Sequence, residues 1–265
     1  MFKSAKKRIA CVWFTFSLDA GQLLYSVAFA RRAFGDDAVL YVFDDDRSPI
    51  CEEAREKLIK GLRAVVLTLK WDRRGNIKGG EHLRNATELY YELAVEHEAE
   101  VVVKCDSDTA ILSRSWVDAL LNREGAIFAG AFCGRNAGYA YGLAYAIKGR
   151  EVLRRLAKDA VDYPASDGAF EDYEVGQRLA RIAGESAVDT HAKWARRHSM
   201  RLGDNDFMLA DASRAQGAPW SVQDLVRCQV VSVGYNCTPS SESGKVAHRR
   251  AQVAMLGEMW RMLEG

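Results

Sequence analysis

The stretch Val-Val-Val-Lys-Cys-Asp-Ser-Asp, residues 101–108, decides how this chain can fold. Its apolar run is typical of a buried strand, and two carboxylates one residue apart, Asp106 and Asp108, follow it at once. Charge at the end of an apolar strand costs free energy unless a metal ion or a hydrogen-bonded ligand offsets it. Carboxylate oxygens suit Mg²⁺ or Mn²⁺, which proteins often bind with one or two carboxylates plus substrate phosphates. A solvated turn with two neighbouring acids is the competing interpretation.

The sequence around this stretch alternates between strand and helix patterns. Strand-like runs cover residues 8–16, 38–43, 64–71, 100–105, 126–132 and 139–147, and helical patterns cover residues 19–34, 49–62, 81–98, 116–122, 150–158 and 170–182. Repeated units of this length predict an α/β fold with a doubly wound, mostly parallel sheet. Such sheets bind ligands beyond the carboxyl ends of their strands, where the strand order switches. The acid pair lies at such an end, as do the three acids of residues 44–46, for which a solvated turn is the favoured explanation.

Composition excludes several classes of protein. The chain has 265 residues, with 37 Lys and Arg against 36 Asp and Glu, a net charge of +1. This balance argues against an obligate nucleic-acid partner, which needs clustered positive charge. No apolar run approaches the roughly 20 residues of a membrane span, so we expect no transmembrane segment. Six scattered cysteines without Cys-x-x-Cys spacing fit a reducing cytoplasm better than a zinc cluster.

A strand followed by Asp-x-Asp-x-Thr resembles the first motif of the haloacid-dehalogenase-type phosphatases. In that family Asp106 would be the nucleophile and Asp108 an acid/base, with Mg²⁺ offsetting the phosphate charge. The motif normally ends the first strand of its sheet, whereas three strand–helix units precede it here. The position of the acid pair therefore disfavours this family.

The chain also resembles the GT-A fold glycosyltransferases, in particular the beta-1,3-galactosyltransferase and Fringe superfamily. Five segments carry the resemblance in the same order: Arg31-Arg32-Ala33-Phe34-Gly35, Asn85-Ala86-Thr87, Asp106-Ser107-Asp108, the glycine-containing run of residues 139–147, and Glu171-Asp172-Tyr173 with Gly176. They extend over about residues 8–185, and the last 80 residues match poorly. The resemblance implies a single GT-A-like domain over residues 1–265. Residues 8–135 would form its nucleotide-sugar-binding half, and residues 136–265 an irregular acceptor-side half.

On the donor side, the resemblance assigns metal coordination mainly to Asp108. Asp106 would contact the ion through water or hold the nucleotide ribose. Arg31, Lys78 and Asn85 are further candidates for contact with the nucleotide. The cofactor would be Mn²⁺ or Mg²⁺, which neutralises charge on the leaving nucleoside diphosphate.

On the acceptor side, Asp172 matches the family's general base, which takes the proton from the acceptor hydroxyl. Glu171 would orient the acceptor or Asp172. Stabilisation of the helix that these acids begin is the competing explanation. His191 is best placed as the family's histidine metal ligand, with His198 and His248 as competitors.

The expected function is inverting transfer of a hexose from a UDP-sugar to an acceptor hydroxyl. The acceptor would be a glycan, a lipid-linked sugar or a protein, met in bacterial surface-glycan synthesis. We expect a cytoplasmic location, with peripheral contact at the inner face of the membrane. Three alternatives stay open: a retaining glycosyltransferase, a Mg²⁺-dependent phosphatase, and a non-catalytic nucleotide-sugar-binding protein.

Overall fold

A computed structural model of the chain describes residues 8–70, 80–132, 140–166, 168–184, 199–201, 206–210, 220–234 and 242–265. Its main sheet has the strand order β3-β2-β1-β4-β7-β6-β8. Strands of this sheet are β1 (Ile9–Thr15), β2 (Ala38–Asp45), β3 (Val65–Leu69), β4 (Val101–Cys105), β6 (Phe128–Phe132), β7 (Ala140–Lys148) and β8 (Ser199–Arg201). The first four strands are mutually parallel, and only β7 runs against its neighbours β4 and β6. The predicted mostly parallel sheet is confirmed.

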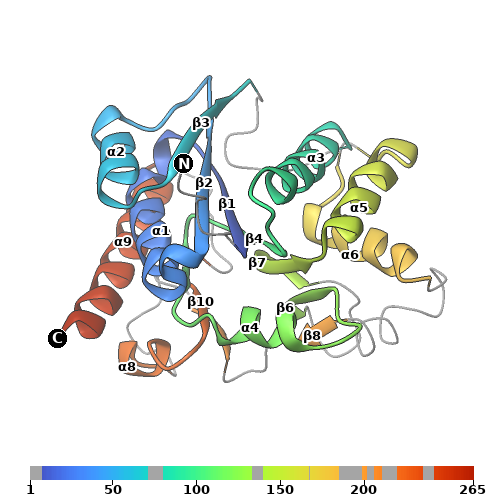
Figure 1. Cartoon of the computed structure of the whole chain (residues 1–265). Coiled ribbons are helices and arrows are strands. Elements are labelled where there is room, and N and C mark those ends of the chain that lie inside the picture. Colours follow the sequence, from blue (N-terminus) through green and yellow to red (C-terminus); the bar gives the residue numbers. More distant parts are fainter. Residues whose placement is uncertain are drawn as a thin grey trace, which may run out of the picture.

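Helices cover both faces of the sheet (Figure 1). The α-helices of the described ranges are α1 (Ala20–Phe34), α2 (Glu52–Glu56), α3 (Gly80–Glu96), α4 (Ser115–Asn122), α5 (Arg150–Asp162), α6 (Glu171–Ile182), α8 (Val222–Leu225) and α9 (Glu242–Glu264), of which α8 and α9 pack outside α1. Every residue of β1 is buried, and the alternating side chains point to two separate cores. Ile9, Cys11 and Trp13 pack toward α1 and α4, whereas Ala10 and Val12 pack toward α3, α5 and α6. The sheet is therefore doubly wound, as predicted.

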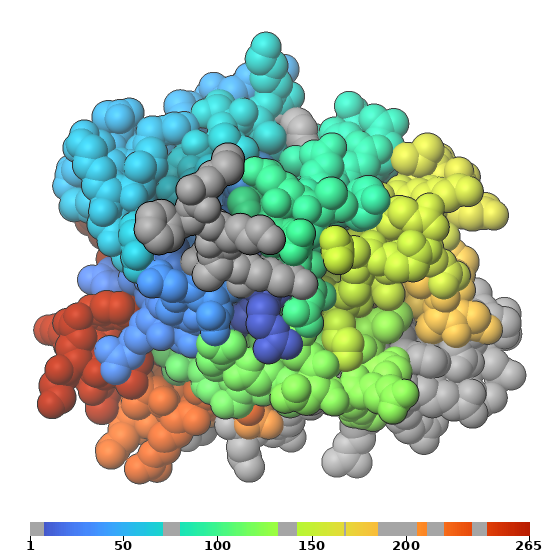
Figure 2. All heavy atoms as spheres, viewed as in Figure 1, coloured from blue at the N-terminus to red at the C-terminus, as the bar shows by residue number. Residues whose placement is uncertain are grey.

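A small second sheet and a long last helix complete the fold. The sheet has the order β5-β10-β9, formed by β5 (Thr109–Ile111), β9 (Phe207–Leu209) and β10 (Val230–Ser232). A third core, which includes Phe29, Leu256 and Met259, joins this sheet and α9 to the outer side of α1. Helices α1 and α9, from early and late in the sequence, thus lie side by side, and the red helix borders the blue one on the molecular surface (Figure 2).

The strand order reverses at β1, because α1 leads to β2 on one side and α3 leads to β4 on the other. The carboxyl ends of β1 and β4 lie at the same edge of the sheet, since the two strands are parallel neighbours. In open α/β sheets this position is where ligands bind. No helix among the described residues has the length and apolar character needed to cross a bilayer.

Candidate functional site

The acid pair lies on a tight turn that joins the two sheets. Asp106 begins the turn, and its backbone N–H donates to the carbonyl of Leu143 at 2.8 Å. The Thr109 N–H then donates to the Asp106 carbonyl at 3.2 Å, and β5 begins at Thr109. The backbone of Asp108 is fixed from the other side, because its carbonyl accepts from the Val233 N–H at 3.0 Å. Both carboxylates are thus held at the carboxyl end of β4, as predicted.

The described surroundings of Asp108 disfavour its charged form. Burial raises the pKa of its carboxyl to about 7, and the nearby carboxylates of Asp106 and Asp19 act in the same direction. A buried group of this kind favours the neutral form unless a cation approaches. The residues therefore fit a divalent ion in their chemistry. Within the described ranges, no three His, Cys, Asp or Glu side chains converge on one point, so bound phosphate or water oxygens would have to complete the ligand set.

Gly234 is the residue that makes room for the Asp108 carboxylate. A Cβ atom at this position would lie 1.6 Å from Asp108 Oδ2 and 2.7 Å from Asp108 Cγ. Gly234 lies just after β10, so the residue that approaches the Asp108 carboxylate has no side chain. Any other residue here would displace the carboxylate. Sequence reasoning missed this glycine, because its neighbour is distant in the chain.

Helix α9 contributes a buried polar cluster to the same site. Gln252 Nε2 lies 3.3 Å from Asp108 Oδ2 and 3.3 Å from His248 Nε2. On its other side, Gln252 accepts a hydrogen bond of 2.5 Å from Gln22 of α1. His248 is 8% exposed, and its Nδ1 atom has no partner in the described structure. Of the three histidines considered, His248 is thus the one that the structure places beside the acid pair. His191 and His198 lie outside the described residues.

A buried lysine connects the acid pair to the acids of α6. Lys104 Nζ lies 2.7 Å from Asp106 Oδ1 and 3.3 Å from Glu171 Oε2, and its side chain is only 4% exposed. It also donates to the carbonyl of Gly142 on β7. Burial alone would lower the pKa of Lys104, but the two carboxylates more than offset this effect and raise the pKa above its ordinary value. Lys104 was not among the predicted site residues.

Glu171 is held by contacts with three side chains. Its Oε1 atom accepts hydrogen bonds from the hydroxyls of Tyr145 and Tyr90, the latter at 3.2 Å. Its Oε2 atom faces Lys104, and the side chain is 9% exposed. Glu171 thus anchors the start of α6, where Asp172 follows it, to β4 and β7. Its expected role in orienting the acceptor or Asp172 stays a prediction.

Asp172, the next residue, has a different environment. Its Oδ2 atom accepts from the Gly142 N–H at 3.2 Å, and its Oδ1 atom accepts from the Tyr173 N–H at 2.8 Å. Gly142 also explains the close approach, since a Cβ there would lie 3.4 Å from Asp172 Cβ. Burial raises the pKa of Asp172, although the two N–H groups act against this effect. A carboxylate with a raised pKa is suited to accept a proton near neutral pH.

The remaining donor-side predictions have different outcomes. Arg31 donates to the backbone carbonyls of Leu62, Gly35, Ala38 and Arg63. Ala38 is the first residue of β2, so Arg31 lies at the sheet edge opposite to the acid pair. This placement argues against the expected nucleotide contact and gives Arg31 a structural role. Asn85 is half-buried on α3, and Lys78 lies outside the described residues.

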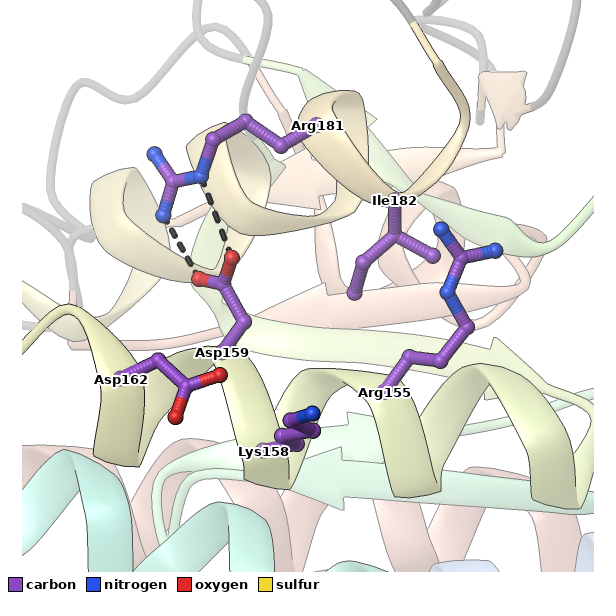
Figure 3. A pocket seen from close by; sticks show the side chains of 6 residues that line it. All are labelled: Arg155, Lys158, Asp159, Asp162, Arg181 and Ile182. Carbon is purple, nitrogen blue, oxygen red and sulfur yellow. Dashed lines mark hydrogen bonds and ion pairs between the residues drawn. The ribbon is translucent and has the colours of Figure 1, made fainter.

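A pocket of about 170 Å³ lies elsewhere, between α5 and the end of α6 (Figure 3). Its lining residues are Arg155, Lys158, Asp159, Asp162, Arg181 and Ile182. Arg181 donates to both oxygens of Asp159, at 3.2 and 2.6 Å, as the dashed lines show. None of the predicted site residues lines this pocket, and its charges are of both signs. The acid pair thus remains the candidate active site.

Comparison with known proteins identifies the fold. No protein-family model and no curated protein sequence matches the chain. Among solved structures, the galactosyltransferase LgtC in complex with donor and acceptor sugar analogs is similar, with a TM-score of 0.50 and 11% identity over 94% of this chain and 95% of that one. The mannosyltransferase PcManGT from Pyrobaculum calidifontis, in complex with GDP-Man and Mn²⁺, also has a TM-score of 0.50. It is 15% identical over 74% of this chain and 55% of that one. The predicted GT-A-like fold is confirmed, and at these identities the similarity shows the fold alone.

Proposed function

We propose that this protein is a metal-dependent glycosyltransferase that moves a hexose from a UDP-sugar to the hydroxyl of a glycan, lipid-linked or protein acceptor. The observation that carries the proposal is the acid pair at the switch in strand order, where desolvation and two nearby carboxylates disfavour the charged form of Asp108. The similarity to two glycosyltransferase structures supports it. PcManGT was solved with a nucleotide sugar and Mn²⁺, which is the kind of ligand that this donor set fits.

In this proposal Asp106 and Asp108 hold Mn²⁺ or Mg²⁺ against the donor diphosphate. The ion, when bound, would neutralise charge on the leaving nucleoside diphosphate. His248 lies near this pair, because Gln252 connects it to Asp108, but the three side chains of Asp106, Asp108 and His248 do not converge on one point. Bound phosphate or water oxygens would therefore complete the ligand set.

Asp172 is the proposed general base, and we infer an inverting transfer. A base of this kind takes the proton of the acceptor hydroxyl as the oxygen attacks the sugar from the side opposite to the leaving group. Asp172 has a raised pKa and is held in place by two backbone N–H groups. General bases typically contribute about 10²–10⁴-fold to a rate, so Asp172→Asn should lower kcat by at least about 100-fold. Its affinity for UDP and Mn²⁺ should stay unchanged.

The first test measures thermal stabilisation by UDP and by GDP, each with and without Mn²⁺. A ligand at 100 times its Kd stabilises the folded protein by about 2.7 kcal/mol. We expect a Mn²⁺-dependent rise in Tm with UDP that is lost in Asp108→Ala. Stabilisation by GDP alone would correct the donor class, and no shift with either nucleotide would overturn the proposed function.

The second test incubates the enzyme with UDP-hexoses and Mn²⁺ and determines the anomeric configuration of the product by NMR. An inverted configuration supports the role of Asp172. Retention together with near-normal turnover of Asp172→Asn would establish a retaining transferase. Release of phosphate from an aryl phosphate with Mg²⁺, abolished by Asp106→Asn, would instead show a phosphatase. Binding of UDP with neither transfer nor hydrolysis would show a binding protein.

A further inference from the structure

Three of the contacts of Lys104 lead to parts of the proposed site, and its Nζ atom also lies 5.8 Å from the centre of the Tyr145 ring. Its Nζ atom lies 2.7 Å from Oδ1 of Asp106, a proposed metal ligand. It lies 3.3 Å from Oε2 of Glu171, the residue that precedes the proposed base. It also donates to the carbonyl of Gly142, whose N–H group donates to Asp172. One ammonium group thus contacts the donor side directly and reaches the acceptor side by two routes.

The local structure leaves this ammonium group little freedom. Lys104 belongs to β4, and its side chain, only 4% exposed, contacts Gly142 of the neighbouring strand β7 and Glu171 in the first turn of α6. Glu171 is fixed in turn by the hydroxyls of Tyr90 and Tyr145. A buried lysine is stable only with such partners, because an unpaired buried charge is costly.

We propose that Lys104 is a positioning residue that orients Asp106 for the divalent ion and fixes the start of α6, and therefore Asp172, relative to it. This inference rests on the proposed function and deepens it. Hydrogen bonds to ligating carboxylates orient metal ligands, and loss of such a partner typically lowers metal affinity or activity by about 10–100-fold. The contact between Lys104 and Asp106 is made through Oδ1 of the carboxylate.

The test uses the double variant Lys104→Met/Glu171→Gln. Lys104→Met alone would leave the buried Glu171 carboxylate uncompensated and could prevent folding. The double variant removes one positive and one negative charge, so the net charge around the ion stays the same. Any change in Mn²⁺ affinity then reports the orientation of Asp106 rather than the electrostatic attraction. Glu171→Gln alone keeps the contact between Lys104 and Asp106 and changes only the contact between Lys104 and Glu171. Comparison with the double variant therefore separates the effects of these two contacts.

Lys148 offers a matched control. Its Nζ atom donates to the backbone carbonyls of Leu120, Leu121 and Arg123, at 3.0, 3.2 and 2.7 Å. It is a half-buried lysine of β7 at the end of α4, and none of these contacts is with a proposed site residue. Lys148→Met should lower the midpoint of unfolding and leave Mn²⁺ affinity within about twofold, because its partners belong to the fold alone.

Mn²⁺ affinity is measured by calorimetry on the folded variants, and kcat is measured with the UDP-sugar. We expect the double variant to bind Mn²⁺ about tenfold more weakly and to lose about 10–100-fold in kcat, with Glu171→Gln alone keeping its Mn²⁺ affinity. Wild-type affinity and kcat in the double variant would overturn the inference, as would an equal loss of affinity in Lys148→Met or in Glu171→Gln alone. A loss of Mn²⁺ affinity in the double variant of a protein that transfers no sugar would support Lys104 and refute only the proposed function. Absence of Mn²⁺ binding in the wild type would overturn both.

Discussion

Replacement of Gly234 by alanine should remove the metal site and leave the fold intact. The added Cβ atom would lie 1.6 Å from Asp108 Oδ2 and 2.8 Å from Gln252 Nε2. Heavy atoms in contact settle at about 3.5 Å, so the carboxylate oxygen must move by roughly 2 Å. Metal ligands keep their distances within about 0.2 Å, and a displacement ten times larger removes Asp108 from any ion that it binds.

The cost to stability should be modest by comparison. Overpacking of a well-packed site typically costs about 1–3 kcal/mol, because neighbouring side chains shift to accommodate the new atoms. Gly234 is not among the described glycines with positive φ, so alanine adds no backbone strain at this position. We therefore expect a folded variant whose Mn²⁺ affinity falls by at least 100-fold and whose Tm no longer responds to UDP with Mn²⁺.

The assay is calorimetric titration with Mn²⁺, with circular dichroism as the check on folding. Gly61→Ala is the matched control, because a Cβ there would meet nothing within 4 Å and its φ is not positive. Gly61→Ala should bind Mn²⁺ like the wild type. A folded Gly234→Ala protein with wild-type affinity would refute the reasoning, since it would show that Asp108 is not a ligand of the ion.

Three further predictions concern the proposed base and two arginines. Because burial raises the pKa of Asp172, kcat/KM should decline as the pH falls through a value above the ordinary range of an aspartate. Asp172→Asn should lose this decline at acid pH. A wild-type profile that is flat down to pH 4 would contradict the role. Arg178 is 1% exposed and forms ion pairs with Asp159 and Glu174. Arg178→Met should therefore lower the free energy of unfolding in urea by about 3–5 kcal/mol. A loss below about 1 kcal/mol would show that these ion pairs are not needed for stability. Arg31→Met should lower the free energy of unfolding by about 1–3 kcal/mol, because its contacts with backbone carbonyls are lost, while the KM for the donor stays within twofold. A large rise in KM at unchanged stability would instead support a contact between Arg31 and the nucleotide.

The first two-thirds of the fold could be predicted because each element there has its own local signal. Buried strands such as β1 and β4 are continuous apolar runs, and Gly35 ends α1 with a φ of 58° that favours glycine. The last third has no comparable signals. Its strands β8, β9 and β10 have three residues each, which is too short for any periodicity to be read, and the same holds for the earlier strand β5. These strands exist because of their pairing with distant segments.

The acid pair could be predicted for the same reason, but the local pattern alone does not show whether such acids form a binding site or a structural turn. The acids that end β2 have the same pattern, yet they are structural. Asp44 is fully buried and accepts from the Ile50 N–H at 3.1 Å, and Asp45 accepts from the Arg47 N–H at 3.0 Å. Asp44 and Asp45 are thus buried turn-forming groups, whereas Asp46, the third acid of the run, is exposed as the sequence suggested. The position at the switch in strand order is what distinguishes Asp106 and Asp108.

The residues around the acid pair escaped prediction because they come from the whole length of the chain. Gln22 and Gln252 are 230 positions apart and still share a hydrogen bond. No local pattern indicates that contact, since it arises only when α9 packs against α1. A polar residue that appears ordinary in its own helix can thus belong to the site. The spacing of His248 and Gln252, one turn apart on one helix face, was the only available signal.

These surroundings divide the two carboxylates into separate roles. Asp108 is enclosed by β10 and α9, through Gly234 and Gln252, so its position depends on the C-terminal part of the chain. Asp106 is held by Lys104, and through it by β7 and α6, where the proposed base lies. A change that loosens α9 should therefore weaken ion binding through Asp108. Loss of the Lys104 contacts should instead disturb Asp106 and the transfer step together. The two acids of this short motif are thus not interchangeable, because each depends on a different part of the chain for its position.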